Sequence, residues 1–137
     1  MENKDHERRQ DKRALFTIEN GILATFTVPG GKIRTMTAYV LNLSMGGIFF
    51  TMRQEEIEKI MKGDRVIFLN IKFRKSQPFI LNAEAEIVWR TREPAREYSG
   101  VGCRFLNLSA NSEEQISRFI EHWNQKSIGL SHFKQSK

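Results

Sequence analysis

The sequence lacks the residue groupings on which most enzymes and membrane proteins depend. Its 137 residues include a single cysteine and three histidines, so a disulfide within the chain is excluded. No H-x-x-x-H, paired-cysteine or G-x-S-x-G pattern occurs, so the sequence indicates neither a metal centre nor a catalytic nucleophile with its base. No apolar run approaches the roughly 18 residues that a membrane-spanning helix needs. We therefore predict a protein that is not an enzyme, holds no metal or cofactor and has no membrane span.

The N-terminal segment and the lone cysteine bear on the compartment. Residues 1–13 carry charges of both signs and lack the apolar stretch of a secretion signal. Cys103 lies in a strand-like run and is predicted to be a small buried hydrophobe, which suits a reducing cytoplasm. A hydrophobic fraction of 39% can supply one core in a chain of this length. The sequence predicts one cytoplasmic domain preceded by a flexible, charged arm over residues 1–13.

Positive charge is the clearest bias of the composition. Lysine and arginine exceed aspartate and glutamate by 22 − 16 = 6, and the sequence pI is about 9.7. Such a balance favours an anionic partner, which leaves a nucleotide, a nucleic acid, an acidic protein surface and a lipid headgroup open.

Alternation of apolar and polar residues predicts a mainly β fold. The run from Phe79 to Trp89 is the clearest, because Ile87 and Trp89 are expected to point inward with the other apolar residues of that run. A short helical turn is expected between Arg53 and Lys62. The six predicted strands are 21–28, 32–43, 48–51, 65–73, 79–89 and 101–106.

The last part of the chain has the period of a helix. Ser112 and Gln115 have the spacing of a capping box, which predicts the start of the helix, and Gly129 is expected to end it. An apolar stripe follows the predicted cap, formed by Ile116, Phe119, Ile120 and Trp123. Six strands and a terminal helix predict a six-stranded antiparallel barrel with a C-terminal α-helix over residues 14–128 and a frayed tail over residues 129–137.

Three arginines in the arm carry the first candidate binding motif. Arg9 and Arg13 form an R-x-x-x-R pattern, and Arg8 adjoins it. A guanidinium fork matches the adjacent O6 and N7 acceptors of guanine, stacks on a purine and donates to phosphate. Taken alone, such a motif in a charged arm is usually a solvated surface.

A polar turn between two predicted strands carries the second motif, N-x-S-x-x-G. Asn42 offers an amide that donates and accepts, and Ser44 offers a compact hydroxyl. Gly46 and Gly47 allow φ > 0 and let a ligand approach main-chain N–H groups. Taken alone, this pattern is usually a turn whose polar side chains bond to local backbone.

The two motifs together, with the later stretch from Gly100 to Ser109, resemble landmarks of the PilZ domain family. The resemblance covers roughly Glu7 to Lys126 and implies a barrel that binds cyclic di-GMP. It implies that Arg9 and Arg13 contact guanine and phosphate, and that Asn42, Ser44 and Gly47 form the turn of the site. A basic residue at Arg8 resembles members that bind a stacked pair of ligand molecules, whereas Asp11 departs from common members and adds a negative charge near the phosphate.

The resemblance implies a receptor that orders its N-terminal arm on ligand binding and signals to an unidentified downstream protein. Two alternatives remain. The first is an interaction adaptor that does not need the nucleotide. The second, favoured less, is a nucleic-acid-binding barrel that stacks bases on aromatic side chains such as Tyr39, Phe49, Phe50 and Trp89, although their alternation with polar residues favours a place in the core.

Overall fold

The computed structural model describes residues 12–30, 33–73, 78–91 and 97–135. Arg8 and Arg9 lie outside the described residues, as does the rest of the arm up to residue 11. Of the three motif arginines, the structure therefore places Arg13.

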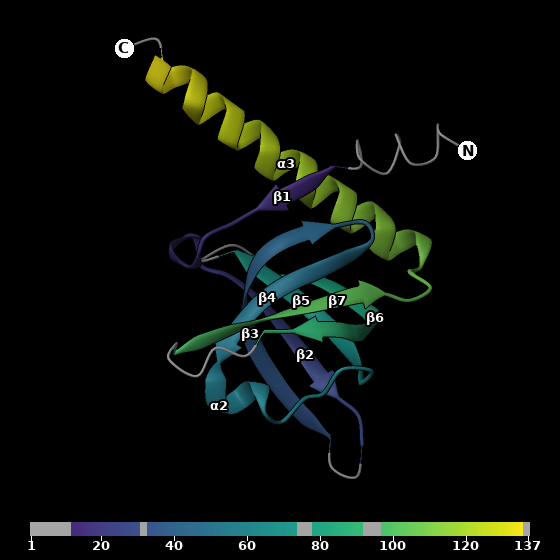
Figure 1. Ribbon diagram of the computed structural model, residues 1–137. Helices are drawn as coiled ribbons and strands as arrows, with labels where there is room; N and C mark the ends of the chain where they lie inside the picture. The colour runs from purple at the N-terminus through teal and green to yellow at the C-terminus, as the bar shows by residue number, and fades with distance from the viewer. Residues whose placement is uncertain (1–11, 31–32, 74–77, 92–96, 136–137) are drawn as a thin grey trace, which may run out of the picture.

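Seven strands form one antiparallel sheet that closes on itself (Figure 1). The neighbours around the barrel run β3-β2-β5-β6-β7-β4, and β4 pairs again with β3 to close six strands into a ring. The six-stranded barrel predicted from the alternation is confirmed. The strand bounds are β1 Arg13–Leu15, β2 Ile22–Val28, β3 Arg34–Ser44, β4 Gly47–Arg53, β5 Arg65–Phe73, β6 Phe79–Arg90 and β7 Tyr98–Phe105.

Strand β1 is short and lies outside the ring, paired with the end of β3. Arg13 lies opposite Ser44, and Leu15 lies opposite Asn42. Ala14 between them is fully buried, so Arg13 and Leu15 face outward. Arg13 thus belongs to the sheet, although the sequence places it in the arm. The register brings the last arginine of the first motif beside the second motif.

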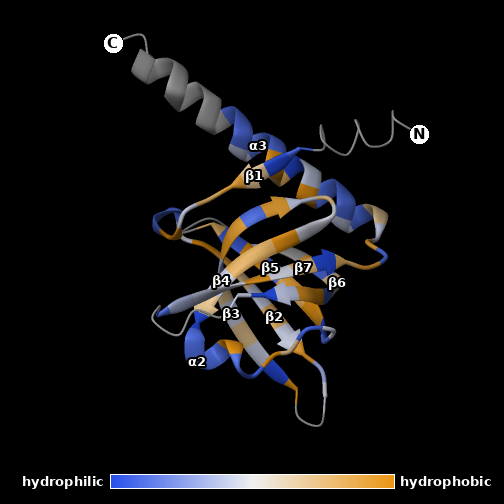
Figure 2. Ribbon diagram, in the orientation of Figure 1, coloured by the Kyte–Doolittle hydropathy of each residue, from blue (hydrophilic) through white to orange (hydrophobic). Residues whose placement is uncertain are grey.

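Three phenylalanines fill the middle of the barrel. Phe26, Phe50 and Phe68 are fully buried, and their ring centroids lie 5.2 to 6.0 Å apart. They come from β2, β4 and β5, so a single cluster ties together strands on different sides of the ring. Figure 2 shows the apolar residues concentrated along the strands and the hydrophilic residues on the helices.

Helix α3, Ala110–Gln135, crosses one end of the barrel beside β1 (Figure 1). Ile116 and Ile120 are buried on the face of α3 that packs against the barrel. Trp123 of the same helix packs edge-on against Phe16, with ring centroids 4.8 Å apart. The predicted apolar stripe is therefore confirmed as the packing face. Within the described part of the chain, no helix combines the length and the hydropathy that crossing a bilayer requires.

The start and end of α3 differ from the sequence-based prediction. The helix begins at Ala110, and the hydroxyl of Ser109 accepts the main-chain N–H of Ser112 at 3.1 Å. Ser112 is buried and donates its own hydroxyl to the carbonyl of Leu81 at 2.7 Å, so it holds the helix to β6 and does not cap it. Helical structure also continues through Gly129 to Gln135, since a helix interior tolerates a single glycine at a cost of about 1 kcal/mol.

Two smaller helical segments complete the chain. The 3-10 helix η1 spans Ile18–Asn20, and α2 spans Gln54–Ile57 at the end of the barrel away from α3 (Figure 1). The helical turn predicted over 53–62 is thus shorter than expected. Arg90 explains part of its ending, because its guanidinium donates to the carbonyls of Ile57 at 3.1 Å and Ile60 at 2.7 Å.

A bulge in β6 reverses the side on which Trp89 lies. Ile87 pairs with Cys103, but Trp89 pairs with Gly102, so Val88 is an extra residue in this strand. Beyond such a bulge, the alternation of inward and outward residues shifts by one. Ile87 is buried as predicted, whereas Trp89 is 42% exposed on the outer wall. The prediction that Trp89 faces the core is wrong for this reason.

Candidate functional site

Four of the predicted binding residues line one cavity on the outer wall of the barrel. Arg13, Asn42, Ser44 and Gly47 come from β1, β3 and β4, and the cavity has a volume of about 260 Å³. The remaining lining residues are Ile48, Phe49, Val88, Trp89, Gly102 and Cys103. The structure therefore joins the two motifs through the β1–β3 pairing.

The polar turn is held by hydrogen bonds within itself. The hydroxyl of Ser44 accepts the N–H of Gly46 at 3.3 Å and lies 3.5 Å from the carbonyl of Gly47, to which it donates. These bonds are those of an ordinary serine turn. Both are long, however, so an anion offers the hydroxyl a stronger acceptor than it has in this structure.

The two glycines of the turn have different roles. A Cβ at Gly47 would collide with the carbonyl oxygen of Cys103 on β7, so this position requires glycine for close strand packing. A Cβ at Gly46 would meet only the Ser44 hydroxyl at 3.9 Å, and Gly46 does not line the cavity. Among the described glycines, the left-handed backbone occurs at Gly21 and Gly63. Space, and not positive φ, is therefore what Gly47 supplies.

Two aromatic rings form a wall of the cavity that the sequence did not predict. Phe49 and Trp89 pack with ring centroids 5.0 Å apart at an interplanar angle of 39°. They lie over β7, where a Cβ at Gly102 would overlap the indole and a Cβ at Gly100 would come within 2.6 Å of the Phe49 ring. The G-x-G pattern of β7 therefore makes room for two rings. Glycines inside a strand are the sequence signal that would have indicated this close approach.

The charge and reactivity of the lining suit an anionic ligand and argue against nucleophilic chemistry. Arg13 is the one charged residue among the described lining residues, and no carboxylate is among them. Burial raises the pKa of the Cys103 thiol to about 12, so it stays protonated and unreactive at neutral pH. Nor do the described residues bring three or more histidine, cysteine or acidic side chains together as a metal centre would.

Helix α3 fixes the main chain that carries Arg13. The amide of Asn124 donates to the Arg13 carbonyl at 3.1 Å, and the indole N–H of Trp123 donates to the Leu15 carbonyl at 3.1 Å. Lys12 adds an ion pair with Glu121 at 2.9 Å on the surface. Strand β1 is thus held between β3 and α3, and the position of Arg13 depends on both.

The structure is thus a closed β-barrel with a terminal helix and a cavity on its outer wall. A family comparison matches the PilZ domain over residues 7–122, so the chain belongs to the PilZ domain family. Membership in this family agrees with the prediction that the chain is not an enzyme. No curated protein matches the chain.

Solved structures of similar fold agree with the family assignment. The PilZ domain of YcgR from Escherichia coli with c-di-GMP matches at a TM-score of 0.62 and 19% identity, over 91% of this chain and 98% of that one. The longer YcgR complex with c-di-GMP matches at 0.64 and 16%, over 91% and 50%. The MrkH–c-di-GMP complex from K. pneumonia matches at 0.65 and 10%, over 95% and 56%. At these identities the likeness shows a shared fold, and the chain spans about half of the two longer proteins.

Proposed function

We propose that this protein is a receptor for cyclic di-GMP, which it binds on the outer wall of its barrel. The observation that carries the proposal is that Arg13, Asn42, Ser44 and Gly47 line one cavity beside an exposed indole. The dinucleotide present in the YcgR and MrkH structures supports this ligand class. The cavity is open to solvent on the outer wall, so one side of a bound dinucleotide would stay exposed outside it.

Each lining group has a role that its chemistry suits. The Trp89 indole offers a flat face on which a guanine stacks, an interaction of about 1–3 kcal/mol per base. The Arg13 guanidinium donates to phosphate or to the O6 and N7 edge of guanine. Asn42 and Ser44 supply an amide and a hydroxyl at the same wall. Gly47 keeps β4 close to β7, which sets the floor of the cavity.

Arg8 and Arg9 complete the site in this proposal by folding over the part of the ligand outside the cavity. Arg13 is already placed by β1, so the ordering cost falls on the residues before it, at about 1–2 kcal/mol for each backbone fixed. Charge-assisted hydrogen bonds return about 1.5–3 kcal/mol each, so several are needed for micromolar binding near −8 kcal/mol. The ordered arm presents a changed surface to a downstream protein in the cytoplasm.

Calorimetric titration of the purified protein with cyclic di-GMP tests the proposal. We expect saturable binding, with one or two molecules per chain according to whether Arg8 supports a stacked pair. Arg9→Ala is expected to weaken binding by at least about tenfold, the scale of one lost charge-assisted hydrogen bond. Arg9→Lys is expected to fail similarly, because an ammonium lacks the planar fork. Arg118→Ala is the control, since Arg118 is exposed on α3 and pairs there with Glu114.

The exposed Trp89 and the half-buried Phe49 also suit stacking of single-stranded nucleic acid, so the titration includes an oligonucleotide arm. Nucleic-acid affinity arises from many phosphate contacts and falls steeply as salt rises. The receptor proposal is supported if cyclic di-GMP binds at physiological salt and added oligonucleotide does not lower its affinity. No heat with the dinucleotide in excess, or wild-type affinity in Arg9→Ala, contradicts it.

A further inference from the structure

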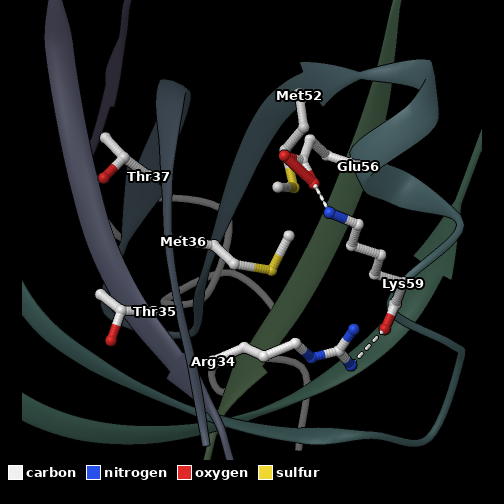
Figure 3. Close-up of a pocket in the computed structure, with 7 residues that line it drawn as sticks. All are labelled: Arg34, Thr35, Met36, Thr37, Met52, Glu56 and Lys59. Carbon is white, nitrogen blue, oxygen red and sulfur yellow. Dashed lines mark hydrogen bonds and ion pairs between the residues drawn. The ribbon is translucent and has the colours of Figure 1, made fainter.

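A second cavity, of about 340 Å³, lies at the α2 end of the barrel and contains none of the motif residues (Figure 3). One side of it is β3, and the other is formed by the end of β4 and by α2 with the turn that follows. Its lining residues are Arg34, Thr35, Met36, Thr37, Met52, Glu56 and Lys59. We call it the edge groove.

The groove exists because the first residues of β3 are not paired with β4. Strand β3 pairs with β2 from Arg34 to Tyr39, but its pairing with β4 starts only at Tyr39. The end of β4 pairs with β7 on its other side. Residues 34–38 therefore have a strand partner on one side, and alternate residues direct N–H and C=O groups toward the groove. A free strand edge is a template for another extended chain.

Two of the four β3 side chains that line the groove leave that edge uncovered. Figure 3 shows Thr35 and Thr37 directed away from the cavity, so these residues line it with their main chain. Met36 and Met52 are largely buried at its floor, where flexible thioethers adapt to an apolar neighbour.

Two cations lie at the α2 wall of the groove. The Arg34 guanidinium reaches across and donates to the Lys59 carbonyl at 2.8 Å, and the Lys59 ammonium pairs with Glu56 at 2.8 Å. Among the described residues, the Lys59 carbonyl is the one acceptor of the Arg34 guanidinium, so the other N–H groups of its fork can meet a carboxylate. Two positive charges against one negative charge favour an acidic occupant.

We propose that the edge groove binds an extended segment of a partner protein as an added strand beside residues 34–38. Because side chains alternate along a strand, Arg34 and Met36 face the same side. The segment therefore carries an apolar residue against Met36 and an acidic residue two positions away against Arg34. A second copy of this chain does not fit, because its residues 34–38 lie inside the same groove and two such recessed edges cannot approach each other.

The inference concerns the output of the proposed receptor, but the groove shares no lining residue with the nucleotide cavity.

The probe is a phage-displayed library of random decapeptides, panned on the full chain with and without cyclic di-GMP. We expect enrichment of β-forming peptides in which an apolar residue and an aspartate or glutamate are two positions apart. Arg34→Glu is expected to weaken an enriched peptide at least about tenfold. Arg118→Glu, with the same change of charge on α3, is expected to bind it normally.

Amide hydrogen exchange followed by NMR separates strand addition from binding through side chains alone. The groove-facing amides of residues 34–38 are expected to exchange quickly in the free protein and to be protected by the peptide. Lys59→Glu serves as a second variant if Arg34→Glu lowers the melting temperature. The inference is overturned if no peptide is enriched, or if the enriched peptides lack the spacing. It is also overturned if they bind Arg34→Glu normally or leave these amides unprotected. Dimers whose amides 34–38 are protected without peptide also overturn it. Failure of cyclic di-GMP binding alone leaves the peptide result standing.

Discussion

Gly102 controls the position of the aromatic wall of the cavity on the outer wall of the barrel. A Cβ at this position would overlap the indole of Trp89. We expect Gly102→Ala to push the indole off β7, to destabilise the fold by about 1–3 kcal/mol through overpacking, and to weaken cyclic di-GMP binding by about tenfold through loss of the stacking face. Urea unfolding and calorimetry measure the two effects.

Gly30→Ala is the matched control for that substitution. A Cβ at Gly30 would meet no heavy atom within 4 Å, and Gly30 lies before β3, away from the cavity. Its substitution is expected to leave both stability and affinity within experimental error of wild type. An affinity for Gly102→Ala equal to that of the control would show that the indole takes no part in binding.

The buried thiol of Cys103 gives the stability of the protein a predictable dependence on pH. Burial raises its pKa from 9.0 to about 12, so the unfolded state loses this proton first as the pH rises. The folded state then binds more protons than the unfolded state, and the free energy of unfolding falls between pH 9 and about 12. Below pH 9 the contribution is fully present.

Urea unfolding across that pH window tests the effect when wild type is compared with Cys103→Val. The variant lacks the thiol but shares every other titratable group with wild type, so its free energy of unfolding is expected to fall less steeply. Equal slopes would mean that the thiol is not shielded from water in the folded protein.

Strand β1 and helix α3 act together to place Arg13, so a change in the helix is expected to affect the ligand. Trp123→Phe retains a ring against Phe16 but removes the N–H that the Leu15 carbonyl accepts. We expect a loss of about 1 kcal/mol of stability, the usual value of such a bond. We also expect a several-fold loss of cyclic di-GMP affinity, because β1 becomes less fixed. Calorimetry and urea unfolding provide both values.

His122→Ala is the control on the same helix. His122 is exposed and adjoins Trp123 in the sequence, so it tests for a general effect of changing α3. It is expected to change neither quantity. If Trp123→Phe lost stability but kept full affinity, α3 would support the fold without positioning Arg13.

The elements of this fold were largely predictable because strands and helices have different periods. Both faces of β2 and the apolar stripe of α3 follow directly from alternation and from i, i+3, i+4 spacing. The start of α3 was not predictable in this way, since Ser112 and Ser109 are both good caps. Which one caps depends on the distant Leu81 carbonyl, which captures the Ser112 hydroxyl.

The candidate site was predictable only in part, for a related reason. Asn42, Ser44 and Gly47 are adjacent in the sequence, and their pattern indicates a polar turn. Trp89 reaches the same cavity through a bulge at Val88, which depends on how β6 pairs with β7. The sequence of β6 itself carries no signal of this bulge. Arg13 joins them through a strand of three residues, too short for a period to reveal.

At the scale of the whole molecule, the barrel wall separates the residues that stabilise the fold from those that we propose contact the ligand. Phe49 and Phe50 are neighbours in β4 but face opposite sides of it. Phe50 is fully buried against Phe26 and Phe68, whereas Phe49 packs against Trp89 in the cavity wall. Substituting each in turn compares the two sides of one strand.

Phe50→Leu is expected to lower the free energy of unfolding by about 1–3 kcal/mol while leaving cyclic di-GMP affinity near wild type. Phe49→Leu is expected to do the reverse, weakening binding by about two- to tenfold because the indole loses an aromatic neighbour worth about 0.5–1.5 kcal/mol. Urea unfolding and calorimetry on the same preparations give both values. A stable domain has about 5–15 kcal/mol to lose before it unfolds, so the Phe50→Leu protein stays folded. Its loss of stability is therefore expected without a loss of affinity. If both variants lost affinity in proportion to stability, the cavity would depend on the core as a whole and not on its own surface residues.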